Sequence, residues 1–228
     1  MRVLDLFCGA GGAAMGLHHA WPSAEIVGVD IKPQPRYPFT FVRGDAMQGD
    51  HRIWAADLQR YIDYRDFDFI WASPMCQLYS KTRAILRGKG LTNPGQNQIP
   101  GIRAALKTAR VHYVIENVPG APLLCPAMLC GTMFGLRVLR HRLFEASFVW
   151  RVPPHFKHDG GTNSHRGYST GAKYVTVGGN NFIRTEGAEA MGIDWMKTRA
   201  ELSQAIPPAY SQYIGEQFSR AGEHQEGT

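Results

Sequence analysis

Short apolar runs alternate with helix-like stretches through the first half of the chain. Residues 2–17 read as a buried strand, a glycine-rich turn and the start of a helix, and further strand-like runs cover residues 25–31, 39–47, 67–73 and 111–118. Apolar runs of this length favour buried strands, whereas residues 99–111 have the pattern of a helix. Strands that alternate with helices predict a mostly parallel sheet covered by helices on both faces, an α/β fold.

The composition changes after residue 150. Residues 151–174 are rich in Pro, Gly, His, Ser and Asn, which favours a loop over a folded domain. An ordered pattern then resumes, and the second half of residues 201–218 reads as a helix. We therefore predict three parts: residues 1–150, a loop-rich insertion at 151–178, and a final part at 179–228 that returns to the first.

Composition and charge narrow the class of protein. The 228 residues are 44% hydrophobic, enough for one core, and no apolar run is long enough to cross a bilayer. Since the chain does not begin with a signal peptide, we expect a cytoplasmic protein without a membrane partner. The formal charge of +6 and the isoelectric point of about 9.3 favour polyanionic partners. Four cysteines in a chain of this length do not suggest a disulfide framework.

A glycine-rich turn follows the first strand. Gly9, Gly11 and Gly12 would let the backbone approach a ligand closely at the start of a helix. Asp30 ends the next strand, where a carboxylate can accept hydrogen bonds from ribose hydroxyls, and Asp45 ends the third, where it could meet an adenine amino group. The turn lacks the lysine of a phosphate-binding loop. These residues therefore predict an adenosine-containing cofactor other than ATP.

Two reactive side chains stand at strand ends. Cys76 follows the apolar run at 67–73, and Glu116 lies near the end of the run at 111–118. Cysteine packs well in protein cores, so a structural role is one interpretation of Cys76. Buried glutamates are rare unless they are paired or functional, and the carboxyl ends of parallel strands border one crevice. The pair therefore predicts a thiol nucleophile beside an acid.

Six short motifs, in order along the chain, resemble those of the cytosine-5 DNA methyltransferase family. They read DLFCGAGG, SPMCQLYS, ENV, RHRLFE, EGAEAMGI and AIPPAY, and the resemblance covers nearly all of the chain outside residues 151–175. It implies a Rossmann-like, S-adenosylmethionine-dependent methyltransferase fold, with a small irregular insertion in place of a recognition domain. Residues 1–150 would then form the catalytic and cofactor-binding domain, and residues 151–178 a short recognition segment.

The resemblance also implies a reaction, the transfer of a methyl group to carbon 5 of a cytosine flipped out of DNA. Cys76 would be the nucleophile that adds to carbon 6 of the base. Glu116 would hydrogen-bond ring N3 and the exocyclic amine. Arg142 would contact the base oxygen, and Arg140 would support the loop or a phosphate.

Two sets of binding residues follow from the same resemblance. S-adenosylmethionine would be held by Asp5, Phe7, Gly9, Ala10, Gly11, Gly12, Asp30, Ile31, Asp45, Ala46 and Pro74. The substrate or the catalytic loop would be held by Gln77, Ser80, Lys81, Arg83 and Asn117.

The chain departs from the family pattern at several points. Met75 stands where the family has proline before the cysteine, and Val138 where it has glutamine in the arginine motif. The very short insertion predicts short or relaxed sequence specificity, or specificity supplied by a protein partner. A small enzyme of this kind would suit a bacterial or phage-infected host cell. Two alternatives stay open, an RNA cytosine-5 methyltransferase and a weakly catalytic subunit that binds DNA or cofactor.

A metal site is not expected. Cys125 and Cys130 are close in sequence, but no second pair stands at ligand spacing, which favours structural thiols. His155, His158 and His165 lie in the polar insertion, where histidines are often simply polar residues.

Overall fold

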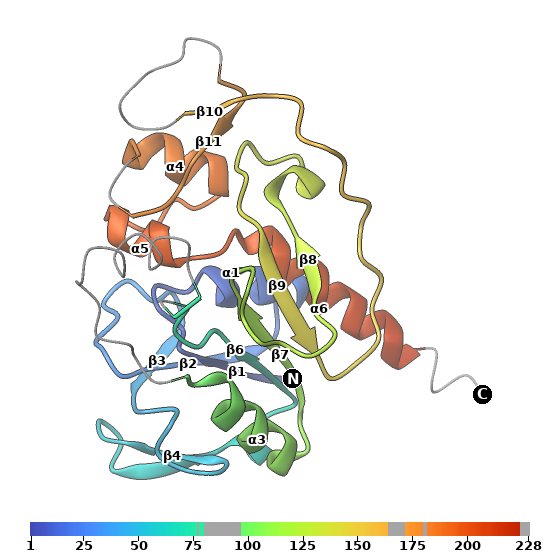
Figure 1. The fold of residues 1–228 in the computed structure, drawn as a ribbon. Helices are drawn as coiled ribbons and strands as arrows, with labels where there is room; N and C mark the ends of the chain where they lie inside the picture. Colours follow the sequence, from blue (N-terminus) through green and yellow to red (C-terminus); the bar gives the residue numbers. More distant parts are fainter. Residues whose placement is uncertain (77, 80–96, 164–171, 180–181, 224–228) are drawn as a thin grey trace.

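The structure is a computed structural model that describes residues 1–76, 78–79, 97–163, 172–179 and 182–223. Its central sheet has seven strands in the order β3-β2-β1-β6-β7-β9-β8 (Figure 1). These strands are β1 (Arg2–Leu6), β2 (Glu25–Asp30), β3 (Thr40–Arg43), β6 (Phe69–Ala72), β7 (His112–Asn117), β8 (Ala127–Leu129) and β9 (Arg142–Ala146). The predicted α/β class is confirmed, and the strand-like runs of the sequence correspond to β1, β2, β3, β6 and β7.

The sheet is parallel except at one edge. Neighbouring strands from β3 to β7 pair in parallel, whereas β9 runs antiparallel to both β7 and β8. In this register Asn117, at the carboxyl end of β7, pairs with Leu143 near the start of β9. The antiparallel edge therefore brings the arginine motif at residues 140–142 to the same end of the sheet as the ends of β6 and β7.

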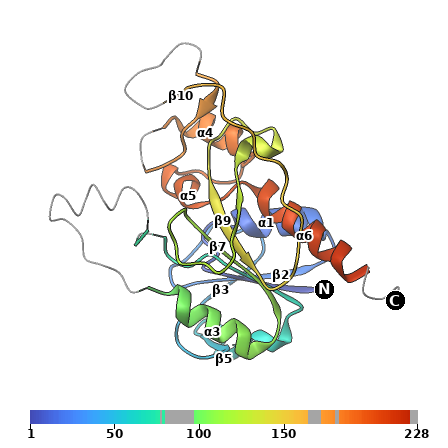
Figure 2. The same ribbon diagram turned by 45° about the vertical axis from the view of Figure 1, so that its right-hand side comes forward.

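Helices cover both faces of the sheet, as the sequence predicted. Helices α1 (Gly12–Ala20) and α6 (Pro208–Glu223) lie together on one face, and α3 (Ile99–Ala109) lies on the other (Figures 1 and 2). All four residues of β6 are buried, which is typical of a strand with helices on both sides. The C-terminal helix packs against the first helix, so the two ends of the described chain close the same core.

A hairpin beside the sheet was not predicted. It consists of β4 (Arg52–Ala55) and β5 (Arg60–Asp63) and leads into the short 3-10 helix η1 (Tyr64–Asp66). In β4, Ile53 is buried and Trp54 is exposed, the alternation of a strand with one face on the core. The pattern is present in the sequence, but it extends over too few residues to predict a strand from one chain alone.

A smaller layer lies over the carboxyl ends of the parallel strands. It contains α4 (Arg184–Met191), α5 (Arg199–Gln204) and the two-stranded sheet of β10 (Thr162–Asn163) and β11 (Tyr174–Val175) (Figure 1). The remaining 3-10 helix, η2 (Gly131–Phe134), follows β8. The insertion was expected to be a loop, but Tyr174, Val175 and Val177 are buried, and both valines belong to a hydrophobic cluster with residues of α4.

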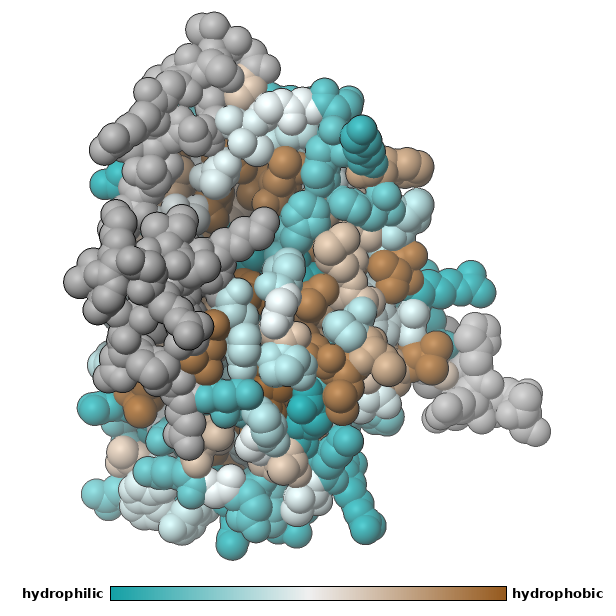
Figure 3. All heavy atoms as spheres, viewed as in Figure 1, coloured by the Kyte–Doolittle hydropathy of each residue, from teal (hydrophilic) through white to brown (hydrophobic). Residues whose placement is uncertain are grey.

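Among the described residues, no helix combines the length and the apolar character needed to cross a bilayer. On the face shown in Figure 3, hydrophobic residues form small groups separated by hydrophilic ones.

Candidate active site

The glycine-rich turn between β1 and α1 is fastened to the end of β2. The backbone amide of Gly9 donates to Asp30 Oδ2 over 3.1 Å, and that of Cys8 donates to the Val29 carbonyl over 3.1 Å. Phe7, Gly9 and Gly11 all have positive φ angles, of 56°, 49° and 85°. Such a run needs residues that tolerate the left-handed region, which explains two of the three glycines.

The three glycines have different surroundings. A Cβ atom at Gly9 would meet no atom within 4 Å, whereas one at Gly11 would lie 2.6 Å from Pro38 Cδ and one at Gly12 2.6 Å from the Ile206 carbonyl oxygen. Gly9 therefore borders open space, where a ligand could approach the backbone. Gly11 and Gly12 allow close packing against other parts of the chain.

Ala10, between Gly9 and Gly11, is held by a tryptophan that no sequence motif predicted. Ala10 is buried, and its carbonyl accepts a hydrogen bond from Trp195 Nε1 over 2.7 Å. Trp195 follows the EGAEAMGI motif by two residues, so this motif supports the glycine turn from the smaller layer. The contact spans 185 residues of sequence, and no local pattern predicts it.

Asp5 lies in β1 beneath the turn and is fully buried. The Tyr37 hydroxyl donates to its Oδ2 atom over 3.2 Å, and its Oδ1 atom has no partner among the described residues. Burial raises the pKa of Asp5 to about 8, against the effect of the Tyr37 hydrogen bond and together with the charge of Asp30. Burial therefore favours the neutral form of Asp5 in the folded protein.

The other predicted cofactor residues follow β2 and β3. Asp30 accepts from the Lys32 amide through Oδ1 over 2.9 Å, and Asp45 accepts from the Met47 amide over 2.9 Å. Ile31 is 60% exposed, while Ala46 is buried and its carbonyl accepts from the Tyr64 hydroxyl. Each carboxylate still has lone pairs for further donors. Two acidic acceptors, one exposed isoleucine and the open space at Gly9 fit an adenosine ligand.

The loop after β6 carries Cys76 and is fixed at two points. The Pro74 carbonyl accepts from Asn117 Nδ2 over 2.9 Å, and the Met75 amide donates to Gln98 Oε1 over 3.0 Å. A proline at position 75 would have no N–H for the second bond. The departure from the family pattern therefore comes with a hydrogen bond to the residue that precedes α3.

Asn117, which was predicted to hold the substrate or the catalytic loop, has a fully buried side chain. Its amide nitrogen donates to Pro74, and its Oδ1 accepts from the Val118 amide over 2.9 Å. Both polar ends of the side chain are thus bonded within the protein. The arrangement ties the Cys76 loop to the end of β7.

Glu116 and Arg142 form a buried ion pair. Arg142 Nε lies 3.0 Å from Glu116 Oε1, and both side chains are largely buried. A second Arg142 nitrogen donates to the His141 carbonyl over 2.9 Å. Burial raises the pKa of Glu116, while Arg142, Arg140 and a hydrogen bond from Ser73 oppose the shift. The pair places an acid with a raised pKa at the end of β7.

The charges of Glu116, Arg142 and Arg140 all act on Cys76. Burial raises the pKa of the thiol, Glu116 raises it further, and the positive charges of Arg142 and Arg140 lower it. The thiol is free and partly exposed. The structure therefore brings Cys76, Glu116 and the two arginines of the RHR stretch together at one end of the sheet.

Arg140 is bonded mainly to backbone. Its guanidinium donates to the carbonyls of Val177 and Ser203, and its own carbonyl accepts from the Tyr210 hydroxyl over 2.6 Å. Burial and the neighbouring Arg142 lower the pKa of Arg140 to about 9. Arg140 joins the arginine motif to the smaller layer, including α5, and to α6.

Four predicted substrate residues lie outside the described residues. They are Gln77, Ser80, Lys81 and Arg83. His165 of the insertion lies outside them as well.

Sequence comparison links the chain to one family. The family model described as C-5 cytosine-specific DNA methylase matches residues 1–121, which include the glycine turn, Cys76 and Glu116. A comparison with curated proteins gave no match.

Solved structures of low sequence identity share the fold. The S. pombe Dnmt2 methyltransferase superposes with a TM-score of 0.60 at 17% identity, covering 96% of this chain and 99% of that one. The Entamoeba histolytica methyltransferase EhMeth superposes with a TM-score of 0.57 at 12% identity, covering 96% of this chain and 98% of that one. The central sheet and its helices are thus those of a Rossmann-like methyltransferase.

Proposed function

Because the chain belongs to the C-5 cytosine-specific DNA methylase family, whose methyl donor is S-adenosylmethionine, we propose that it methylates carbon 5 of cytosine in DNA. The observation that carries this proposal is the convergence of Cys76, Glu116 and Arg142 at the carboxyl ends of β6 and β7. The wider class, an S-adenosylmethionine-dependent cytosine-5 methyltransferase, follows from the family itself.

The cofactor supplies an electrophilic methyl group on a sulfonium. The residues proposed to hold it surround the ends of β1, β2 and β3. Gly9 would let the backbone approach the ligand, Asp30 would accept from the ribose hydroxyls and Asp45 from the adenine amine. Ile31 would cover an apolar face of the ligand.

The proposed chemistry begins with the Cys76 thiolate. It would form a bond to carbon 6 of cytosine, and the ring electrons would then make carbon 5 nucleophilic enough to take the methyl group, whose bond to the cofactor sulfur breaks and leaves a neutral thioether. Loss of the carbon 5 proton to a base, with cleavage of the sulfur–carbon 6 bond, restores the aromatic ring and the thiolate. The base must first leave the helical stack to reach the loop after β6.

Glu116 and Arg142 act on the cytosine ring in this proposal. Glu116, with its raised pKa, would donate its proton to ring N3 and so stabilise the adduct, and its carboxylate would take the proton back when the sulfur–carbon 6 bond breaks. Arg142, held against Glu116, contacts the base oxygen. Arg140 and Asn117 act as positioning residues, because their polar atoms bond the surrounding backbone.

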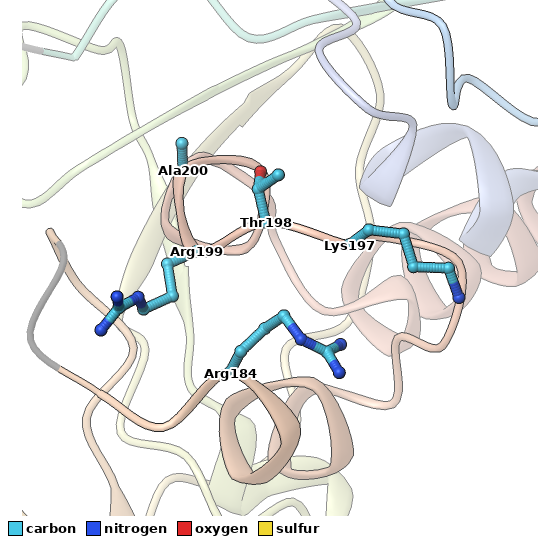
Figure 4. A pocket seen from close by; sticks show the side chains of 5 residues that line it. All are labelled: Arg184, Lys197, Thr198, Arg199 and Ala200. Carbon is cyan, nitrogen blue, oxygen red and sulfur yellow. The ribbon is translucent and has the colours of Figure 1, made fainter.

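The charge of the protein supports a nucleic acid substrate. Arg184, Lys197 and Arg199 surround one recess on the smaller layer (Figure 4). Such a group suits the phosphates of a polyanion. We propose residues 151–178 as a compact recognition segment between a catalytic part at 1–150 and a returning part at 179–228. A segment this short favours short or relaxed specificity, or a partner protein that supplies it.

Methyl transfer to several substrates tests the reaction and its substrate class. Tritiated S-adenosylmethionine is offered with duplex DNA, tRNA and free dCMP in parallel. We expect incorporation into DNA, and bisulfite sequencing of DNA from cells that express the chain should then report the sequence context. Incorporation into tRNA alone would replace the DNA proposal with an RNA one, and no incorporation at all would overturn both.

Covalent trapping tests the nucleophile. DNA that contains 5-fluorocytosine cannot lose a proton from carbon 5, so the adduct should accumulate as a shifted band. Cys76→Ser should abolish the band, and the exposed Cys125, as Cys125→Ser, provides a matched control that should keep it. A band that persists in Cys76→Ser would remove Cys76 from the proposed role.

A further inference from the structure

One cysteine and three histidines gather outside the candidate active site. This cysteine–histidine cluster consists of Cys130, His141, His155 and His158, whose ligand atoms all lie within 4.8 Å of one another. Cys130 immediately precedes η2, His141 immediately precedes β9, and the other two histidines lie on the extended segment before β10. The cluster therefore joins three separate stretches of the chain.

Two of the distances within the cluster are close to those of a tetrahedral zinc site. Zinc binds thiolate sulfur at about 2.3 Å and imidazole nitrogen at about 2.0–2.1 Å, so tetrahedral ligands lie about 3.3 Å apart for two nitrogens and about 3.6 Å apart for sulfur and nitrogen. The His158 and His141 Nε2 atoms are 3.2 Å apart, and Cys130 Sγ is 3.8 Å from His158 Nε2.

Ordinary packing explains the cluster less well. A hydrogen bond between two imidazoles would account for one contact, but here three rings meet with their centroids 4.9–5.3 Å apart and a buried sulfur beside them. The Thr132 hydroxyl also donates to the sulfur over 3.4 Å, a supporting bond of the kind found around metal-bound thiolates. Imidazole and thiolate together are a ligand set that suits zinc.

We propose that the cysteine–histidine cluster binds one Zn²⁺ ion in a closed, structural site. Four protein ligands complete the tetrahedron, which leaves no position for a reacting water. The ion would fasten the segment that carries His155 and His158 to the edge of the catalytic sheet. His141 stands between Arg140 and Arg142, so the same ion would also fix the arginine motif. Metal binding would thus supply stability to a segment with few buried side chains of its own.

Only part of this signal is visible in the sequence. Cys130 lies close to Cys125 in the sequence, and His155 and His158 lie close to each other, but this pattern favours structural thiols and polar histidines. His141 lies inside the arginine motif, and nothing in the sequence marks it as a ligand. The fold brings these residues together across 28 positions between Cys130 and His158, which explains why ligand spacing did not predict the site.

Metal content and a cobalt spectrum test the proposal on the full chain. Protein purified without chelator should carry about one zinc per chain by elemental mass spectrometry. Protein reloaded with Co²⁺ alone should show a thiolate-to-cobalt charge-transfer band and the intense visible bands of tetrahedral cobalt. Full-length folded protein that retains no zinc after dialysis, or a cobalt complex without the thiolate band, would overturn the proposal.

Substitutions then assign the ligands. Cys130→Ala and His158→Ala should each lower the retained zinc at least about tenfold, while Cys125→Ala and the exposed His19→Ala should keep it. Circular dichroism identifies any variant that fails to fold, and the cobalt spectrum of the unchanged protein tests the thiolate without substitution. Equal zinc retention in Cys130→Ala, His158→Ala and the controls would place the metal elsewhere and refute this site.

Discussion

The charges of Glu116 and Cys76 depend on each other. The Glu116 carboxylate raises the pKa of the thiol, and burial favours the neutral form of Glu116 itself. A proton on Glu116 therefore removes one of the influences that hold the thiol protonated, while Arg142 and Arg140 continue to favour the thiolate. The combination of a neutral acid and a thiolate is the one that the proposed addition to carbon 6 requires.

Glu116→Gln separates these two effects. Loss of the negative charge that Glu116 carries when it pairs with Arg142 should lower the pKa of Cys76 and speed its alkylation by iodoacetamide at neutral pH by about two- to tenfold, since one pKa unit changes the thiolate fraction about tenfold. Methyl transfer should fall at least about a hundredfold, because the proton donor is lost. Peptide mass spectrometry measures Cys76, with Cys125 as the internal control. Slower alkylation of Cys76 in this variant would contradict the electrostatic argument.

Asp5 predicts a pH dependence of stability. Its folded pKa of about 8 exceeds the ordinary value of 3.8, so the folded state keeps a proton that the unfolded state releases. Stability is therefore lost as the pH rises from about 4 to about 8 and changes no further above that range. Asp5→Asn should be more stable than the parent at pH 8, with the difference vanishing near pH 4. One pKa unit corresponds to about 1.4 kcal/mol in the free energy of unfolding. Urea unfolding would therefore detect the effect even if the true shift of the Asp5 pKa were only a quarter of this one.

Asp63 provides a control, because its pKa is lowered in the folded protein and its effect on stability therefore changes with pH in the opposite direction. The hydrogen bond from Arg65 lowers its pKa to about 2, so it contributes stability above its ordinary pKa and loses it as the pH falls toward 2. Asp63→Asn should therefore be less stable than the parent at neutral pH. If the difference in free energy of unfolding between Asp5→Asn and the parent stays constant from pH 4 to pH 8, the proposed role of the Asp5 proton is wrong.

At the scale of elements, two helices far apart in sequence close one face of the sheet. A Cβ at Gly16 of α1 would lie 2.0 Å from the Pro208 carbonyl oxygen, and the Ser211 hydroxyl donates to the Ala13 carbonyl over 2.8 Å. The glycine allows the two backbones to approach. Since α1 begins within the glycine turn, this packing also fixes the cofactor side of the site.

Gly16→Ala tests that contact. Alanine favours an exposed helix by about 1 kcal/mol over glycine, but overpacking against backbone should exceed this and lower the free energy of unfolding by about 2 kcal/mol. Chemical denaturation measures the change. Gly178→Ala is the control, because a Cβ there would meet no atom within 4 Å, and its stability should be close to that of the parent. A Gly16→Ala variant as stable as the control would show that α1 and α6 can separate without loss.

At the scale of the whole molecule, the features that could be predicted from the sequence are those that a local pattern of residues determines. The buried strands and the positions of Cys76, Glu116 and Asp30 at their ends follow from apolar runs and polar termini. The roles of Gly12, Trp195 and Asn117 depend on packing between distant parts of the chain, which no local pattern contains. The same limit hid the cysteine–histidine cluster and the buried valines of the insertion.

The distribution of charge predicts how salt affects DNA binding. Arg184 and Lys197 border the recess on the smaller layer, whereas Arg65 follows the β4–β5 hairpin, which lies at the opposite end of the molecule from α4 (Figure 1). Each phosphate contact contributes about 0.9 to the slope of log binding constant against log salt concentration. Arg184→Ala combined with Lys197→Ala should therefore reduce the slope for duplex DNA by about 2, measured by fluorescence anisotropy of the full chain. Arg65→Ala should leave the slope unchanged, since its guanidinium pairs with Asp63 over 2.6 Å. If the double variant keeps the slope of the parent while Arg65→Ala reduces it, DNA binds at the hairpin end, away from the proposed active site.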